Sequence, residues 1–108
     1  MAMVWVRAGV CEKETTIEAR RSDMTHVRLT FDTTCEHVQK LAEALTELDV
    51  ASEMSIPRAE SRTCRLATEH LCRNSCIIPA ALLKAVEVEM GLFLPAESRI
   101  EFVEGAAG

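Results

Sequence analysis

The chain has 108 residues, of which 48% are hydrophobic and 27% charged, with a formal net charge of -5 at pH 7. This length and composition suit one α+β or similar globular domain, because two cores of half the size would be too small to be stable unaided. Nucleic-acid binding needs clustered Lys and Arg, whereas the basic residues here are scattered among acidic ones, so no nucleic-acid partner is expected.

The expected compartment follows from what the sequence lacks. No stretch reaches the roughly 18 consecutive apolar residues of a membrane span. The first eleven residues lack a basic leader, and Arg7 interrupts what would be the apolar part of a signal peptide. We therefore expect no membrane association and a cytoplasmic location, where a reducing pool disfavours disulfides. The odd number of cysteines, five, points the same way.

The first third of the chain is predicted to form strands. A β-prone run at residues 4–6 predicts a short strand, and alternating apolar and polar side chains predict two more over residues 14–20 and 27–31. The polar residues 21–25 between the last two strands predict an antiparallel hairpin.

Apolar spacing then changes to that of a helix. A first helix is predicted over residues 34–48, with Thr33 and Glu36 forming a capping box at its start. Its apolar positions are Val38, Leu41, Ala42, Leu45 and Leu48. The same reasoning predicts a second helix over residues 59–73. A third is expected to begin at Pro79, to face inward with Leu82, Leu83, Val86 and Met90, and to end at Gly91.

The end of the chain carries one more strand-like pattern. Apolar and polar residues alternate over residues 98–103 and predict a short last strand. The predicted fold is therefore α+β in the order βββαααβ: a three-stranded antiparallel sheet, with the C-terminal strand as a candidate addition, packed against three helices. Residues 1–104 are expected to form a single domain and residues 105–108 a flexible tail.

Three cysteines fall at predicted element ends, where ligands usually lie. Cys11 lies in the turn between the first two strands, Cys35 near the start of the first helix, and Cys76 in the loop before the third helix. A helix start favours a thiolate over a thiol. Cys64 and Cys72 instead fall on the apolar face of the second helix and are expected to be core residues, because free cysteine packs as a small hydrophobe.

Three thiolates and a fourth ligand would suit tetrahedral zinc or an iron–sulfur cluster, both of which take sulfur ligands. Cys11, Cys35 and Cys76 are therefore the candidate metal ligands. The candidates for the fourth position are Cys72, His37, Glu12 and Glu36. On this hypothesis the protein holds or transfers its metal and is not an enzyme.

Two alternatives stay open. The chain could be a non-enzymatic interaction or oligomerising domain with structural cysteines, pairing with itself or a protein partner through an exposed sheet face or the strand around Ile100. It could also be a thiol enzyme in which Cys35 is activated by His37 or His70. Residues two apart on a helix point in different directions, which argues against the pair Cys35 and His37.

The positions of these cysteines also carry a resemblance. Val10-Cys11-Glu12 precedes the hairpin, Thr33-Thr34-Cys35 precedes the first long helix, and Ser75-Cys76-Ile77-Ile78-Pro79 precedes the last. The separations are 24 residues (11 to 35) and 41 residues (35 to 76). In order and spacing the chain resembles the iron–sulfur cluster assembly scaffolds of the IscU and NifU N-terminal type. The resemblance implies their fold and a cluster or metal held by Cys11, Cys35 and Cys76.

The chain differs from those scaffolds at three places. Glu12-Lys13 stands where the family usually has Gly-Asp, Ser75 stands where it has His, and the chaperone-docking segment Leu-Pro-Pro-Val-Lys is missing. The chain also resembles a family of short prokaryotic proteins of unknown function with a Gly-x-Cys start, a Cys-Glu helix opening and a Cys-x-x-Pro segment. That second resemblance implies no activity.

Overall fold

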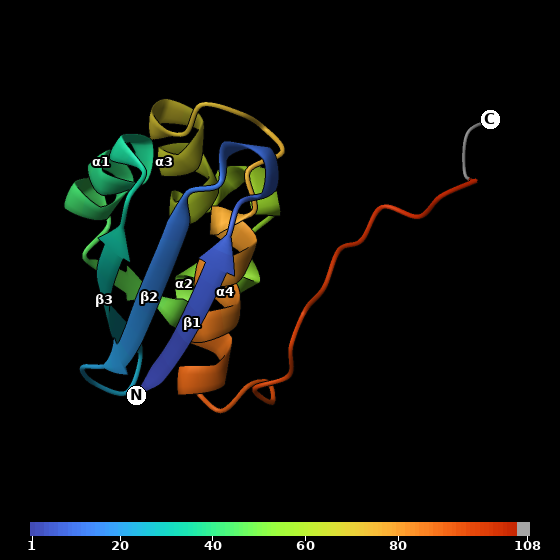
Figure 1. Ribbon diagram of the computed structural model, residues 1–108. Coiled ribbons are helices and arrows are strands. Elements are labelled where there is room, and N and C mark those ends of the chain that lie inside the picture. Colours follow the sequence, from blue (N-terminus) through green and yellow to red (C-terminus); the bar gives the residue numbers. More distant parts are fainter. Residues whose placement is uncertain (106–108) are drawn as a thin grey trace.

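Four antiparallel strands form one sheet, and helices cover one of its faces (Figure 1). The computed structural model describes residues 1–105. The strands are β1 (Ala2–Arg7), β2 (Glu14–Arg21), β3 (His26–Thr33) and β4 (Glu47–Asp49). The helices are α1 (Glu36–Ala44), α2 (Val50–Ser55), α3 (Arg62–His70) and α4 (Ile78–Glu89), with 3₁₀ turns η1 (Gly9–Cys11) and η2 (Arg58–Glu60).

The sheet is a meander in the order β1-β2-β3-β4, and the predicted hairpin of β2 and β3 is present. The alternation of buried and exposed side chains along the strands explains why the helices cover one face of the sheet. Ile17 and Ala19 of β2 are fully buried, whereas Glu14 and Arg20 on the opposite face are exposed. Because successive side chains of a strand point to opposite faces, this pattern fixes the register against the helices.

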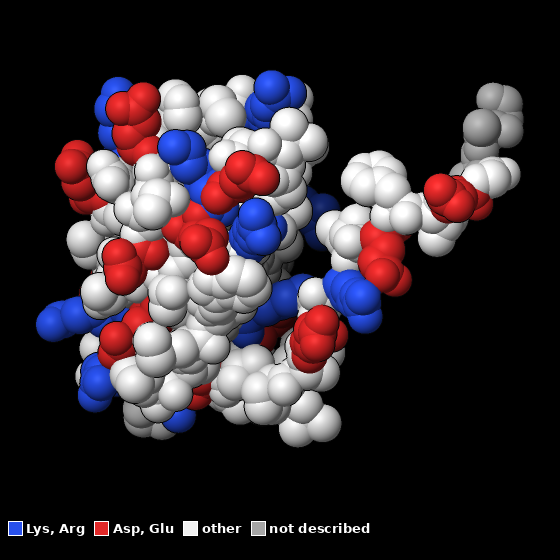
Figure 2. All heavy atoms as spheres, viewed as in Figure 1, with Lys and Arg blue, Asp and Glu red and all other residues white. Residues whose placement is uncertain are grey.

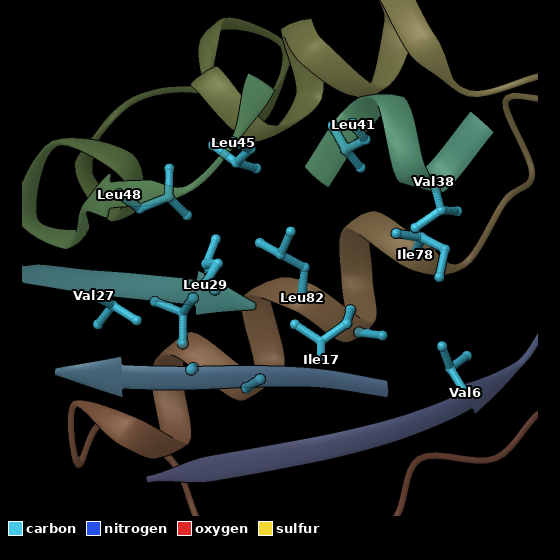
Figure 3. Close-up of a cluster of buried hydrophobic side chains, with 14 of the residues drawn as sticks. Val6, Ile17, Val27, Leu29, Val38, Leu41, Leu45, Leu48, Ile78 and Leu82 are labelled. Carbon is cyan, nitrogen blue, oxygen red and sulfur yellow. The ribbon is translucent and has the colours of Figure 1, made fainter. Parts of the chain in front are cut away.

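The core lies between the sheet and the helices. Helix α4 crosses β1 and β2, while α1 packs against β3 and α3. In Figure 3, Leu82 of α4, Leu41 of α1 and Ile17 of β2 reach into the same apolar space. All three side chains are fully buried. The charged side chains lie outside it, and on the face seen in Figure 2 acidic and basic residues are interspersed.

The fourth strand is not the predicted one. The helix predicted over residues 34–48 ends at Ala44, and Leu48 lies in β4, opposite Val27 of β3. Helical spacing misled here because a buried leucine three residues after Leu45 fits a strand as well as a helix. Helix α2 begins directly after β4. Its N-cap is Asp49, whose side chain accepts the N–H of Ser52 at 3.3 Å.

The predicted C-terminal strand is also corrected. Residues 98–103 form no strand and extend away from the body of the molecule (Figure 1). Their apolar side chains are open to solvent, with Phe102 fully exposed. The element order is thus βββαβααα, not βββαααβ, and the helices number four within residues 1–105. Of the predicted tail, residues 105–108, all but the first lie outside the described residues.

The predicted capping box at α1 is wrong. Cys35 is the N-cap residue and has no side-chain cap hydrogen bond. Thr33 belongs to β3, where its Oγ1 lies 2.6 Å from Thr15 Oγ1 and accepts the N–H of Cys35 at 3.1 Å. A residue held in a strand ladder cannot also adopt the N-cap position, which explains the failure.

The later helices are close to the prediction. Helix α3 is shorter than the predicted range 59–73, and Ser61 caps it by accepting the N–H of Cys64 at 3.1 Å. Pro79 is the second residue of α4, and Gly91 follows its end at a φ of 74°, a conformation that favours glycine. Leu82 and Val86 are fully buried as predicted, whereas the predicted inward residues Leu83 and Met90 are half-buried.

A buried carboxylate joins two of the helices. Glu53 of α2 is 7% exposed and accepts the N–H of Arg62 at 3.0 Å and that of Thr63 at 2.7 Å. These amides belong to the first turn of α3, which has no partners for them within the helix. Among residues 1–105 no helix is long and apolar enough to cross a lipid bilayer.

Candidate functional site

The sheet topology brings two of the predicted site residues to one end. In an antiparallel meander the turn after β1 and the residue after β3 lie at the same end of the sheet, so Cys11 in η1 and Cys35 before α1 share that end. Two hydrogen bonds tie the strands there. The N–H of Thr34 donates to the Glu14 carbonyl at 3.1 Å, and the N–H of Glu14 donates to Thr34 Oγ1 at 3.1 Å.

The turn that carries Cys11 is tightly wound. The N–H of Glu12 donates to the Gly9 carbonyl at 2.9 Å, and both residues have positive φ, 56° and 74°. Gly9 permits this sharp bend, since glycine adopts a positive φ at little cost. Cys11 is exposed, and its thiol donates to the Ala8 carbonyl at 3.6 Å.

Cys76 lies in the connection from α3 to α4, which passes over the same end of the molecule as the turn between β1 and β2 (Figure 1). Its N–H donates to the Arg73 carbonyl at 3.3 Å. Burial raises the pKa of the Cys76 thiol, and the N–H of Ile78 opposes this rise. Repulsion from neighbouring thiolates raises that pKa further, and the neighbours are Cys35, Cys72 and Cys11.

The structure reverses the expectation for which cysteines pack in the core. Cys35 and Cys76, predicted at loop ends, are half-buried and pack against the core. Cys72, predicted as a core residue, is exposed, because α3 ends at His70 and the chain leaves the helical path before it. Cys64 stays on α3 and is half-buried, but the residue of that helix that packs on the core is Leu66.

A hollow of about 480 Å³ opens beside this end of the molecule. Three cysteines line it, namely Cys64, Cys72 and Cys76, together with the side chains of Arg58 and Arg73. Cys72 and Cys76 are therefore neighbours in two respects, through the shared hollow and through the effect of Cys72 on the pKa of Cys76.

The other candidates for the fourth ligand position have different surroundings. The Glu12 carboxylate is 74% exposed and lies 3.7 Å from the Arg7 guanidinium. Glu36 is exposed and His37 is half-buried in the first turn of α1. No hydrogen bond joins Cys35 to His37 within the described part of the chain, so the pairing that a thiol enzyme would use is not formed there.

The gathered thiols do not stand in metal-binding geometry. Among residues 1–105 no three His, Cys, Asp or Glu side chains are arranged to hold a metal ion. All five cysteines are free thiols. Cys72 and Cys76 share a hollow, and Cys11 and Cys35 lie close enough to Cys76 to affect its pKa.

The fold and this arrangement define a small α+β domain with a thiol-rich end. A family model described as "Family of unknown function (DUF6951)" matches residues 2–102. The chain belongs to this family, which confirms the expected resemblance to a family without an assigned function. No curated protein and no solved structure shows significant similarity to the chain. The resemblance to IscU and NifU scaffolds stays a prediction.

Proposed function

We propose that this domain binds a thiolate-ligated metal, either a zinc ion or an iron–sulfur cluster, and holds or transfers it without turning over a substrate. The proposed ligands are Cys11, Cys35, Cys76 and, in the fourth position, Cys72. One observation carries the proposal: Cys72 and Cys76 line the same hollow, beside the end of the sheet that also carries Cys11 and Cys35.

The chemistry of the donor set fits such a metal. Burial and repulsion from neighbouring thiolates both raise the pKa of the Cys76 thiol, so without a cation Cys76 favours its protonated form. A bound zinc or iron ion reverses that preference, because a coordinating thiol loses its proton. Soft sulfur ligands are those that zinc and iron–sulfur clusters take in proteins. The raised pKa of Cys76 is thus the property that a cation would offset.

The burial of the four cysteines divides them into two pairs. Cys35 and Cys76 pack against the core, which restricts the movement of their side chains. Cys11 and Cys72 are exposed, on a turn and on a loop. The exposed pair would have to move for all four sulfurs to reach the roughly 2.3 Å distance of a zinc–sulfur bond.

The resemblance to cluster assembly scaffolds supports the same three ligands. It implies one cysteine in a turn before the hairpin, one at the start of a helix and one before the last helix. Cys11, Cys35 and Cys76 lie at those places, in η1, at the N-cap of α1 and ahead of α4. Cys72 is favoured as the fourth ligand because it shares a hollow with Cys76 and, unlike Cys64, raises the pKa of Cys76.

The test is metal content, measured on protein purified without oxygen and without a metal-binding tag. Elemental analysis and the absorption spectrum should show near-stoichiometric zinc, or iron with sulfide-to-iron charge-transfer bands. Cys35→Ser and Cys76→Ser should lose the metal. Cys64→Ser is the matched control, since Cys64 is also half-buried and lines the same hollow as Cys76 but is not a proposed ligand, and it should keep the metal.

The outcomes separate the site from the function. Equal metal retention by Cys35→Ser and Cys64→Ser would contradict the ligand assignment. Metal-free protein that also refuses added zinc and iron would contradict the function itself.

A further inference from the structure

The last part of the described chain exposes several large apolar side chains. After Gly91 the chain continues in an extended form away from the core (Figure 1). Six large apolar side chains along it are 56% to 101% exposed, and they are Leu92, Phe93, Leu94, Ile100, Phe102 and Val103. Single apolar residues are ordinary on a surface, but two groups of them, residues 92–94 and 100–103, close together on one extended segment suggest an interaction site.

Strand β1 offers a partner surface of the right kind. It is the edge of the sheet, because β2 is its single neighbour among residues 1–105. An unpaired edge presents a row of N–H and C=O groups to any extended chain that approaches it. Two large apolar residues of β1 are also open to solvent: Met3 is 59% exposed and Trp5 is 61% exposed.

We propose that residues 98–103 of one copy of this chain add as a strand to the β1 edge of a second copy, and that the exchange is reciprocal in a two-fold dimer. The two segments match in length, since β1 and residues 98–103 each have six residues. They also match in pattern, because Ile100 and Phe102 alternate with Arg99 and Glu101 as in a strand with one apolar face. Strand addition of this kind is a common mode of recognition.

The position where the extended segment begins favours a second copy over the segment's own β1. Helix α4 ends beside the start of β1, where the amino group of Met1 lies 3.1 Å from Glu89 Oε1. A segment turning straight back from there would run parallel to its own β1, in a sheet whose strands are otherwise antiparallel. Parallel pairing is slightly less stable per residue, and a second copy permits the antiparallel arrangement.

The area also suits a stable dimer. Two reciprocal segments would cover four aromatic rings, Phe102 and Trp5 of each copy, and a buried aromatic side chain covers about 150–250 Å². With the aliphatic side chains of both copies this reaches the order of 1,200–2,000 Å², the range of specific interfaces. The family match runs to residue 102 and so covers residues 98–102 of this segment.

The test uses the full chain, which has one tryptophan, Trp5, as a built-in reporter on β1. Light scattering after size exclusion, with a chelator present so that metal bridging plays no part, should give twice 12.0 kDa. Trp5 emission should shift to shorter wavelength as the protein concentration rises. The double variant Ile100→Asp and Phe102→Asp should raise the dimer dissociation constant at least about 100-fold and abolish that shift.

Met24→Asp is the control, because it places the same charge at an exposed methionine in the turn between β2 and β3, and it should dimerise like the unaltered chain. A monomer at about 100 μM, well above the dissociation constant expected for an interface of this size, would overturn the proposal. A dimer unaffected by the double variant would overturn it equally. The chelator keeps this result independent of the proposed metal site.

Discussion

The two ends of the sheet differ in the groups that meet there. At the end where β1 begins and β2 turns into β3, opposite charges are paired. The N–H of Thr25 and the His26 ring lower the pKa of Asp23 to about 2, and Asp23 in turn raises the pKa of His26. Glu89 accepts the N–H of Arg21 at 2.8 Å and contacts the amino terminus at 3.1 Å.

At the other end, groups that carry the same charge when ionised are gathered. Cys76 has a raised pKa through burial and through Cys35, Cys72 and Cys11, although Arg58 and Arg73 line the hollow that it shares with Cys72. The comparison teaches that opposite charges pair with one another at the first end, whereas at the thiol end groups of like charge raise the pKa of Cys76. Proteins commonly place unfavourable electrostatics of this kind at functional sites.

The largest effect on stability is expected in the apolar core next to the thiol end. Ile78 is 1% exposed and follows Cys76 closely at the start of α4. Ile78→Ala should lower the free energy of unfolding by about 2–5 kcal/mol, because it leaves a cavity in the core. Urea denaturation measures this. Ile56→Ala, at a residue 39% exposed, is the control and should lower the free energy of unfolding clearly less. Equal losses in the two variants would contradict a tightly packed core beneath Cys76.

The second-largest effect on stability is expected at Glu53, the buried carboxylate that joins α2 to α3. Glu53→Ala leaves the N–H groups of Arg62 and Thr63 without their acceptor and should cost about 1–3 kcal/mol. Thermal unfolding at pH 7 measures the loss. Glu43→Ala on the exposed side of α1 should change stability by less than about 0.5 kcal/mol. A matching small change for Glu53 would contradict its role.

Much of the sheet and the last helix was predictable from sequence, because local patterns there are strict. Alternation in β2 and β3 fixes which residues face the helices, and Pro79 and Gly91 mark both ends of α4. The missed strand β4 has only three residues. Its Leu48 is buried by pairing with β3, a long-range contact that helical spacing in the sequence cannot distinguish from a longer α1.

In the candidate site too, local sequence patterns were predictive and long-range contacts were not. The positions of Cys11, Cys35 and Cys76 at element ends followed from local signals and are observed. The neighbourhood of Cys72 was missed, since a longer α3 would have placed that residue on an apolar helix face. Which thiols approach one another depends on the path of the loop after α3, and no periodic pattern encodes the path of a loop.

The smallest expected effect is the acid response of the closed end. The Arg21 N–H holds the pKa of Glu89 below its ordinary value, so the ionised form stabilises the fold. That stability, up to about 1 kcal/mol, is present above the unfolded pKa and is lost as pH falls through the folded pKa. Glu89→Gln should remove this acid-dependent part. An unchanged pH profile of the variant between pH 3 and 6 would contradict it.

The most direct test of the account is the protection of individual cysteines by metal. Each thiol is alkylated under anaerobic conditions with and without bound zinc or reconstituted cluster, and its modification is measured by mass spectrometry. The account predicts that Cys11, Cys35, Cys72 and Cys76 become protected together, while Cys64 reacts at an unchanged rate. Protection of Cys64 alongside the others, or protection of none, would contradict a metal site at the thiol end.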